Sequence, residues 1–202
     1  MRKIVVLSMV TLDGVMQAPG APEEDTSGGF TYGGWTAGIK DVDGSFGAML
    51  GKEFSVPFDL LLGRKTYDIF AGYWPKQSGP VADPFNKAKK YVASEKGTDI
   101  SWEGSVLLDG DVVSKIKALK QEDGPMLQVH GSGQFIQTLL KNDLIDELRL
   151  RIFPITLGSG KHLFREGTIP AAFELLESRA LASGIIIANY KRSGEVKTGT
   201  VG

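Results

Sequence analysis

An order of short apolar strand, glycine turn and helix occurs twice in this sequence, and it restricts the fold more than any other feature. The mostly apolar residues 59–62 end at Gly63, and residues 66–73 after that glycine have helical character. The same order returns where residues 126–129 are followed by glycines within 131–133 and by a helix with one apolar face. Strands that alternate with single helices predict a mainly parallel sheet with helices on both of its faces.

Other segments extend this arrangement. Further strands are expected at residues 4–9, 90–93, 106–108 and 148–153, and further helices at residues 46–54 and 111–121. The segments 173–182 and 185–191 predict an antiparallel pair. The expected fold class is therefore a three-layer α/β/α structure, with a mainly parallel central sheet and an antiparallel C-terminal edge.

Length and composition indicate one domain. A chain of 202 residues with 42% hydrophobic residues can bury one sizeable core, and no repeat or composition shift divides it. We expect a single domain over residues 1–192 and a disordered polar tail over residues 193–202. The net charge of -1 offers no field that would attract nucleic acid or anionic lipid, so neither is expected as a partner.

The chain contains no cysteine, which excludes disulfides, thiol nucleophiles and cysteine-based zinc sites. The apolar run that follows Arg2 and Lys3 is too short for a signal peptide and is soon followed by Asp13, so a buried strand is the preferred interpretation. No stretch approaches the roughly 20 apolar residues of a membrane helix. A reducing, cytoplasmic location is expected by default.

The segment 17–38 is crowded with Gly, Pro, Ser and Thr and carries the aromatic residues Phe30, Tyr32 and Trp35. This composition favours a long ordered loop, and such loops are often lids or ligand walls. A flexible insertion with a few aromatic residues is nearly as compatible with the composition.

Two candidate anion sites lie at the two glycine turns. Gly63, Arg64, Lys65 and Thr66 place two cations and a hydroxyl at the start of a helix, whose free N–H groups and dipole attract phosphate. The segment 131–134 (Gly-Ser-Gly-Gln) starts another helix, and glycines let a pyrophosphate approach the backbone.

Neither site is specific by itself. The first also fits a strand end with two solvated cations. The second lacks the third glycine of the dinucleotide-binding fingerprint, since Ile136 stands at that position. Two such turns at neighbouring strand ends are stronger evidence than one, because a dinucleotide needs several anion contacts.

Several motifs carry a family resemblance. The segments 61–67 (Leu-Leu-Gly-Arg-Lys-Thr-Tyr), 89–94 (Lys-Lys-Tyr-Val-Ala-Ser) and 129–135 (Val-His-Gly-Ser-Gly-Gln-Phe) resemble the NADPH site of dihydrofolate reductases and related riboflavin-pathway reductase domains. The segments 8–14 and 153–164 resemble the riboflavin-type branch, which is the reductase part of the bifunctional deaminase/reductase. The resemblance covers about residues 3–191 and is weakest in the glycine-rich loop.

The resemblance implies a set of cofactor contacts. Gly63, Arg64, Lys65 and Thr66 would hold the adenosine-side phosphates of NADPH, with Ser94 near the 2′-phosphate. Gly131, Ser132, Gly133 and Gln134 would hold the pyrophosphate, and the His130 backbone would lie near the nicotinamide. Asp13, at the end of the first strand, is the candidate catalytic or substrate-contacting residue; a turn aspartate before Gly14 is an equally good interpretation.

The function implied by the resemblance is hydride transfer from NADPH to a small heterocyclic or sugar-derived substrate, as in 5-amino-6-(5-phosphoribosylamino)uracil reductase. A non-catalytic NADPH-binding or redox-sensing module is the alternative. Relatives in this branch are often homodimers, so a homodimer is expected. No metal site is expected, because His130 and His162 are the only histidines and no zinc-deaminase pattern accompanies them.

A true dihydrofolate reductase places a carboxylate on the helix before the Gly63 strand. The spacing of that family falls on Gly47, and the nearest acids, Asp41, Asp43 and Glu53, lie outside that turn, although a different loop length would bring Asp43 inward. The sequence therefore predicts poor turnover of dihydrofolate.

Overall fold

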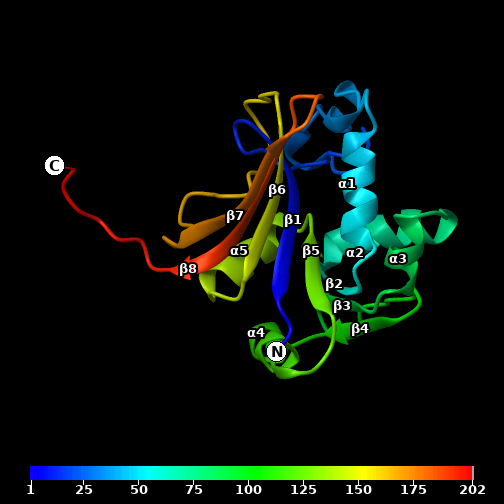
Figure 1. Ribbon diagram of the computed structural model, residues 1–202. Coiled ribbons are helices and arrows are strands. Elements are labelled where there is room, and N and C mark those ends of the chain that lie inside the picture. Colours follow the sequence, from blue (N-terminus) through cyan, green and yellow to red (C-terminus); the bar gives the residue numbers. More distant parts are fainter. Residues whose placement is uncertain (202) are drawn as a thin grey trace.

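The computed structural model describes residues 1–201, which form one eight-stranded sheet with helices on both faces (Figure 1). The strand order is β4-β3-β2-β5-β1-β6-β8-β7. The strands are β1 (Ile4–Thr11), β2 (Phe58–Gly63), β3 (Lys90–Ala93), β4 (Ser105–Leu108), β5 (Met126–His130), β6 (Glu147–Phe153), β7 (Ala172–Ala180) and β8 (Ile186–Gly194). The six strands β1 to β6 pair in parallel, whereas β8 is antiparallel to both β6 and β7. The predicted fold class is confirmed, including the antiparallel C-terminal edge.

The helices are α1 (Ser45–Phe54), α2 (Arg64–Tyr73), α3 (Ala82–Lys87), α4 (Val112–Gln121) and α5 (Gly133–Lys141). Three 3-10 helices, η1 (Ser27–Gly29), η2 (Trp35–Gly38) and η3 (Trp74–Lys76), complete the set among the described residues. Asp111 caps the start of α4, because its side chain accepts a hydrogen bond from the Ser114 N–H. Helix α3 was not predicted, because it contains Pro84 and only a short apolar face.

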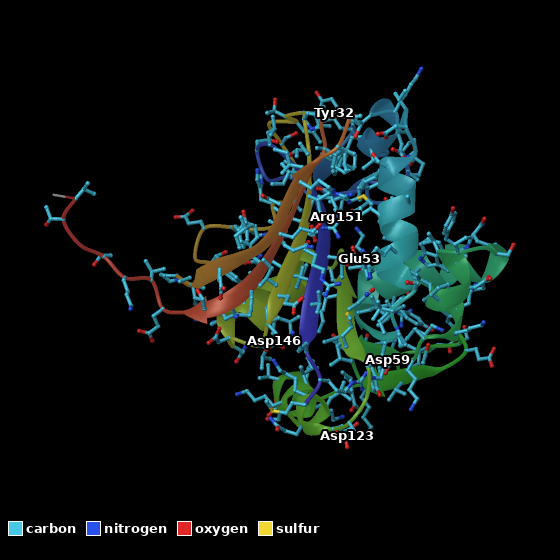
Figure 2. All side chains as sticks on the ribbon, in the orientation of Figure 1. Tyr32, Glu53, Asp59, Asp123, Asp146 and Arg151 are labelled. Atoms are coloured by element: carbon cyan, nitrogen blue, oxygen red, sulfur yellow. The ribbon has the colours of Figure 1, made fainter. Side chains whose placement is uncertain are left out.

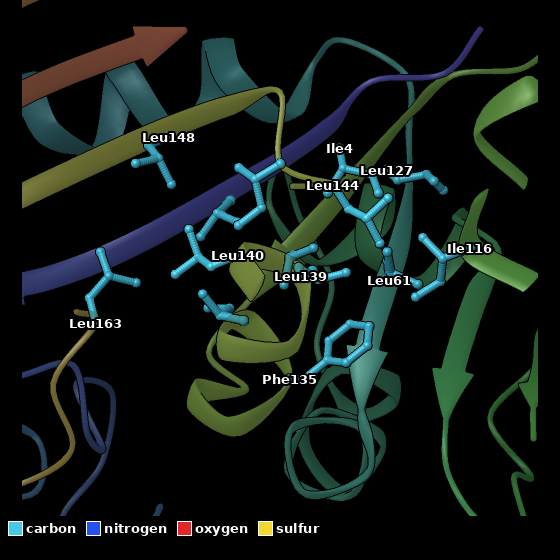
Figure 3. Packing of buried hydrophobic residues seen from close by; sticks show 14 of the residues in the cluster. Ile4, Leu61, Ile116, Leu127, Phe135, Leu139, Leu140, Leu144, Leu148 and Leu163 are labelled. Carbon is cyan, nitrogen blue, oxygen red and sulfur yellow. The ribbon is translucent and has the colours of Figure 1, made fainter. Parts of the chain in front are cut away.

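The central strand β1 contributes side chains to two core layers, one on each face of the sheet. Ile4 and Val6 face the side of α4 and α5, while Val5 and Leu7 face the side of α1, α2 and α3. All four are buried, and the period of two along the strand places them on opposite faces of the sheet. Figure 3 shows the first layer, in which Phe135, Leu139 and Leu140 of α5 pack under the sheet.

Segment 17–38 packs as an ordered loop. Gln17 Nε2 donates to the carbonyl oxygens of Asp25 and Ser27 at 2.9 Å each, and Trp35 Nε1 donates to the Gln17 carbonyl at 2.8 Å. The Phe30 and Trp35 side chains are buried in a third apolar cluster with Phe153 and Ile187. Phe30 and Trp35 therefore anchor the loop to the sheet, whereas Tyr32 is exposed.

The C-terminal boundary differs from the expected one. Strand β8 continues to Gly194, which pairs with Ala172, so the expected tail starts two residues too early. Residues 195–201 are in neither a helix nor a strand and are exposed. Within residues 1–201 no helix has the length and apolar character needed to cross a membrane.

Charged side chains cover the face of β6 that lies toward α1. Glu53, at the end of α1, pairs with both Arg149 and Arg151 of β6, and Glu53 and Arg151 are almost completely buried (Figure 2). Arg149 also pairs with Glu147 at 3.0 Å. The Glu53 carboxylate is therefore occupied by two ion pairs, which hold α1 against the sheet.

Candidate functional site

The two glycine turns meet at the carboxyl ends of β2 and β5. The Gly63 N–H donates to Ser132 Oγ at 3.1 Å, and Ser132 Oγ donates to Thr66 Oγ1 at 2.7 Å. A Cβ atom at Gly63 would come within 3.1 Å of Phe135 Cβ, so the close approach of the two turns favours glycine there. The two candidate anion sites are thus two halves of one site.

A cavity of about 940 Å³ opens at this edge of the sheet. This volume lies at the upper end of the range for small-molecule and cofactor sites, roughly 300–1,000 Å³. Of the residues implied by the resemblance, its walls include Gly63, Arg64, Lys65, Thr66, His130, Gly131, Ser132, Gly133 and Gln134. The walls also include residues of β1, loop 17–38, α1, α2, η3, α3, β3, α5 and segment 160–165.

The amino end of α5 is the strongest anion-binding element of the cavity. Gly131 and Ser132 have φ of 54° and 56°, a left-handed conformation that starts the helix. Among the described residues, no acceptor satisfies the N–H groups of Gly133, Gln134 and Phe135. Free N–H groups and the positive end of a helix dipole bind phosphate.

Arg165 adds a charge that sequence reasoning missed. An ideal Cβ built on Gly133 would lie 2.9 Å from Arg165 Nη2, so the guanidinium stands directly beside the first turn of α5. Within the described part of the chain, Arg165 has no carboxylate partner. Its segment has no helix or strand, and therefore no periodic pattern could have marked it.

The other cations of the cavity are paired. Arg64 binds Asp68 at 2.8 Å on the surface and donates to the Asp99 carbonyl oxygen at 3.0 Å. Lys65 and Lys161 share Asp25, which comes from loop 17–38. Burial would raise the pKa of Asp25, but the hydrogen bonds from Lys161, Lys65 and Ser27 outweigh burial and lower it.

Glu24 is a second acid of the cavity wall that sequence reasoning missed. Its Oε2 accepts hydrogen bonds from the N–H groups of Gly20 at 2.6 Å and Ala21 at 3.2 Å. Burial nevertheless raises the pKa of Glu24, because it penalises the charged form more than these bonds favour it. A carboxyl group with a raised pKa can act as a proton donor.

Asp13 lies outside the cavity walls. Its carboxylate accepts a hydrogen bond from the Thr11 hydroxyl, which lowers its pKa, and further bonds from the N–H groups of Leu157 at 3.1 Å and Gly158 at 2.7 Å. This geometry fits the turn interpretation and gives no support to the expected catalytic role.

Ser94 is also outside the walls, although the adjacent Ala93 lines them. Its hydroxyl lies 3.0 Å from Thr98 Oγ1. The expected contact with a 2′-phosphate stays a prediction.

The His130 ring lies at the inner wall. It packs against Phe54, Phe70 and Phe85 at centroid distances of 6.0, 6.0 and 5.1 Å. Burial lowers the pKa of His130 to about 3, so the imidazole is neutral at physiological pH. Its Nε2 is 3.1 Å from Gln128 Oε1.

These features define an α/β protein of dihydrofolate-reductase-like topology, with its ligand cavity at the carboxyl ends of the parallel strands. Residues 2–187 match the model of the RibD C-terminal domain family, and the chain belongs to that reductase family. No group of three or more potential metal ligands occurs among the described residues.

Several individual proteins are similar to this chain in sequence or in fold. Over 96% of both chains, the sequence is 27% identical to uncharacterized protein YyaP of Bacillus subtilis (strain 168). A putative riboflavin biosynthesis protein from Shewanella sp. PV-4 superposes with a TM-score of 0.67 at 25% identity, over 95% of this chain and 99% of that one. Dihydrofolate reductase from Enterococcus faecalis, solved with NADP(H), shares the fold with a TM-score of 0.58 at 13% identity, over 94% and 96% of the two chains.

Proposed function

We propose that this protein is an NADPH-dependent reductase that transfers hydride to a C=N or C=O bond of a small heterocyclic or sugar-derived molecule. Hydride adds to the carbon, a proton adds to the nitrogen or oxygen, and NADP+ leaves. The observation that carries the proposal is the junction of the Gly63 and Gly131 turns through Ser132, beside the open amino end of α5.

The cavity residues fit a phosphorylated dinucleotide. The free N–H groups at the start of α5 and the Arg165 guanidinium would hold the pyrophosphate. Arg64 would bind the 2′-phosphate by leaving Asp68, and this exchange costs little because the ion pair is half exposed. NADPH, when bound, supplies the hydride.

Glu24 is the proposed proton donor. It lines the cavity, and its Oε1 has no partner among the described residues, so this oxygen is free to carry the proton. The raised pKa keeps the carboxyl protonated to higher pH than an ordinary glutamic acid. Reduction is therefore expected to slow as pH rises above that pKa.

The test is a screen of NADPH oxidation against pteridines, ribityl pyrimidines and simple carbonyl compounds, followed by the Glu24→Gln variant on the best substrate. We expect turnover in the wild type and a loss of about a hundredfold in kcat in the variant, the usual effect of removing a positioned acid. The NADPH affinity of the variant should be unchanged. Tight NADPH binding without turnover of any compound would favour the non-catalytic module.

A further inference from the structure

Segment 163–168 carries Arg165, and it is held against one face of α5. Gly133 and Gln137 are four residues apart on that helix, so they lie one turn apart on the same face. Because Gly133 has no side chain, the Arg165 guanidinium can lie beside it, with Nη2 2.9 Å from the place of an ideal Cβ atom. Gln137 lies outside the cavity walls, whereas Arg165 is part of them.

Gln137 binds this segment on both sides of Arg165. Its Nε2 donates to the Leu163 carbonyl oxygen at 2.7 Å, before the arginine in the chain. Its Oε1 accepts a hydrogen bond from the Thr168 hydroxyl at 3.0 Å, after the arginine. One amide side chain therefore uses both its donor and its acceptor to fix the two ends of the segment on α5.

Thr168 extends this restraint to the backbone of Arg165. The Thr168 hydroxyl oxygen accepts the Arg165 N–H at 3.0 Å. The Thr168 N–H donates to the Arg165 carbonyl oxygen, also at 3.0 Å. Both backbone groups of Arg165 are thus bound to a residue that is itself bound to Gln137.

The Arg165 side chain has few restraints of its own. Its Nε donates to the His162 carbonyl oxygen at 3.4 Å, and within the described part of the chain it has no carboxylate partner. An arginine side chain loses rotamer freedom when it binds an anion, and this loss lowers the affinity. A backbone fixed on α5 keeps the guanidinium beside the free N–H groups of the first turn and reduces that loss.

We infer that Gln137 is a positioning residue of the cofactor site, which acts on the pyrophosphate through Arg165 without touching it. The inference rests on the proposed function, because it takes the anion at the start of α5 to be the pyrophosphate of NADPH. The first turn of α5 and the guanidinium then form one anion site. The Gln137 amide fixes the position of one relative to the other.

The test is a double-mutant cycle of Gln137→Met and Arg165→Ala, measured by calorimetric titration at low salt with NADPH, NADH and inorganic pyrophosphate. Methionine has the length and helix propensity of glutamine but lacks its donor and acceptor, so Gln137→Met changes α5 little. Thr168→Val removes the hydroxyl from the other side of the contact, and Thr168→Ser keeps it. Gln121→Met, at the exposed end of α4, is the matched control.

We expect Gln137→Met and Thr168→Val each to weaken all three ligands about three- to tenfold, through lost preorganisation of one arginine. NADPH and NADH should lose the same factor, because both carry the pyrophosphate. Thr168→Ser and Gln121→Met should match the wild type. In the Arg165→Ala background, Gln137→Met should have no further effect, because the residue that it positions is gone.

An equal loss from Gln137→Met with and without the Arg165 side chain would show that the amide only stabilises α5, and it would overturn the inference. Wild-type affinity in both Gln137→Met and Thr168→Val would overturn it as well. If the wild type bound pyrophosphate but not NADPH, the proposed function would be contradicted, and the cycle with pyrophosphate would still decide the role of Gln137. Binding of neither ligand would contradict both.

Discussion

Ser132 Oγ lies 2.7 Å from Thr66 Oγ1, and through this contact the turn after β5 is fixed to the first turn of α2. The same oxygen accepts the Gly63 N–H at 3.1 Å. The two turns, 66 residues apart in the sequence, are therefore held together as one surface. The Ser132 hydroxyl acts as an acceptor toward Gly63 and as a donor toward Thr66.

Ser132→Ala is expected to loosen this junction. The Gly63 N–H would lose its acceptor, which costs about 1–2 kcal/mol of unfolding free energy. NADPH affinity should fall about tenfold if the lost positioning costs a similar energy. Urea unfolding and calorimetric titration measure the two effects. Ser193→Ala, at an exposed position, is the control, and unchanged cofactor affinity in Ser132→Ala would show that the junction is only structural.

Gly133→Ala is a better test of cofactor binding than a substitution at Gly131, because it is expected to change binding without changing folding. At Gly131 a φ of 54° makes any side chain strained, so a substitution there would disturb folding as well as binding. At Gly133 the φ is helical and the added Cβ meets only the flexible end of Arg165 at 2.9 Å. We expect a retained melting temperature and about tenfold weaker NADPH binding, by displacement of one charge-assisted contact. Normal binding would place the pyrophosphate elsewhere.

The stability of the protein should depend on His130 at mildly acidic pH. Its folded pKa of about 3 is below its unfolded value of about 6.5, so the unfolded chain binds the extra proton between these values. Stability therefore falls as pH drops through this window, by about 1.4 kcal/mol per pH unit from this one group. The pH slope of chemical unfolding should be shallower by that amount in His130→Phe. Equal slopes would mean that the folded protein protonates His130.

Dihydrofolate should be a poor substrate. Asp41 caps the start of α1 by accepting from the N–H groups of Phe46 and Gly47, and Glu53 is paired with two arginines of β6. No carboxylate of α1 therefore reaches the cavity within the described residues. Glu24 lines the cavity from loop 17–38 and not from α1, where a dihydrofolate reductase carries its carboxylate, so we expect turnover of dihydrofolate at least about a hundredfold below a competent enzyme. Steady-state assays of the wild type, Asp43→Asn and Asp13→Asn check this, and fast wild-type turnover would contradict it.

Local patterns in the sequence were sufficient for most of the fold. Apolar runs that end in glycine predicted the parallel strands, because a strand buried on both faces needs continuous apolar residues. The same patterns located the turns at Gly63 and Gly131. Helix α3 was not predicted because its six residues are too few to show a helical period of apolar residues.

The site was only half predictable. Arg165, Lys161 and Glu24 come from segments without periodicity, and only the folded chain brings them to the cavity. Asp13 is well placed along the sequence, but the N–H groups of Leu157 and Gly158, 144 and 145 residues away, take its carboxylate. Contacts between residues so far apart in the chain cannot be predicted from local sequence patterns.

Calorimetric titration with NADPH and NADH tests the central claim most directly, using the wild type, Arg64→Ala and Arg165→Ala. We expect one NADPH per chain, weaker NADH binding, and a loss of roughly ten- to a hundredfold in NADPH affinity in each variant. Arg165→Ala should weaken both cofactors, because both carry the pyrophosphate, whereas Arg64→Ala should weaken NADPH alone. Absence of NADPH binding by the wild type, or equal affinity for both cofactors in all three proteins, would contradict the account.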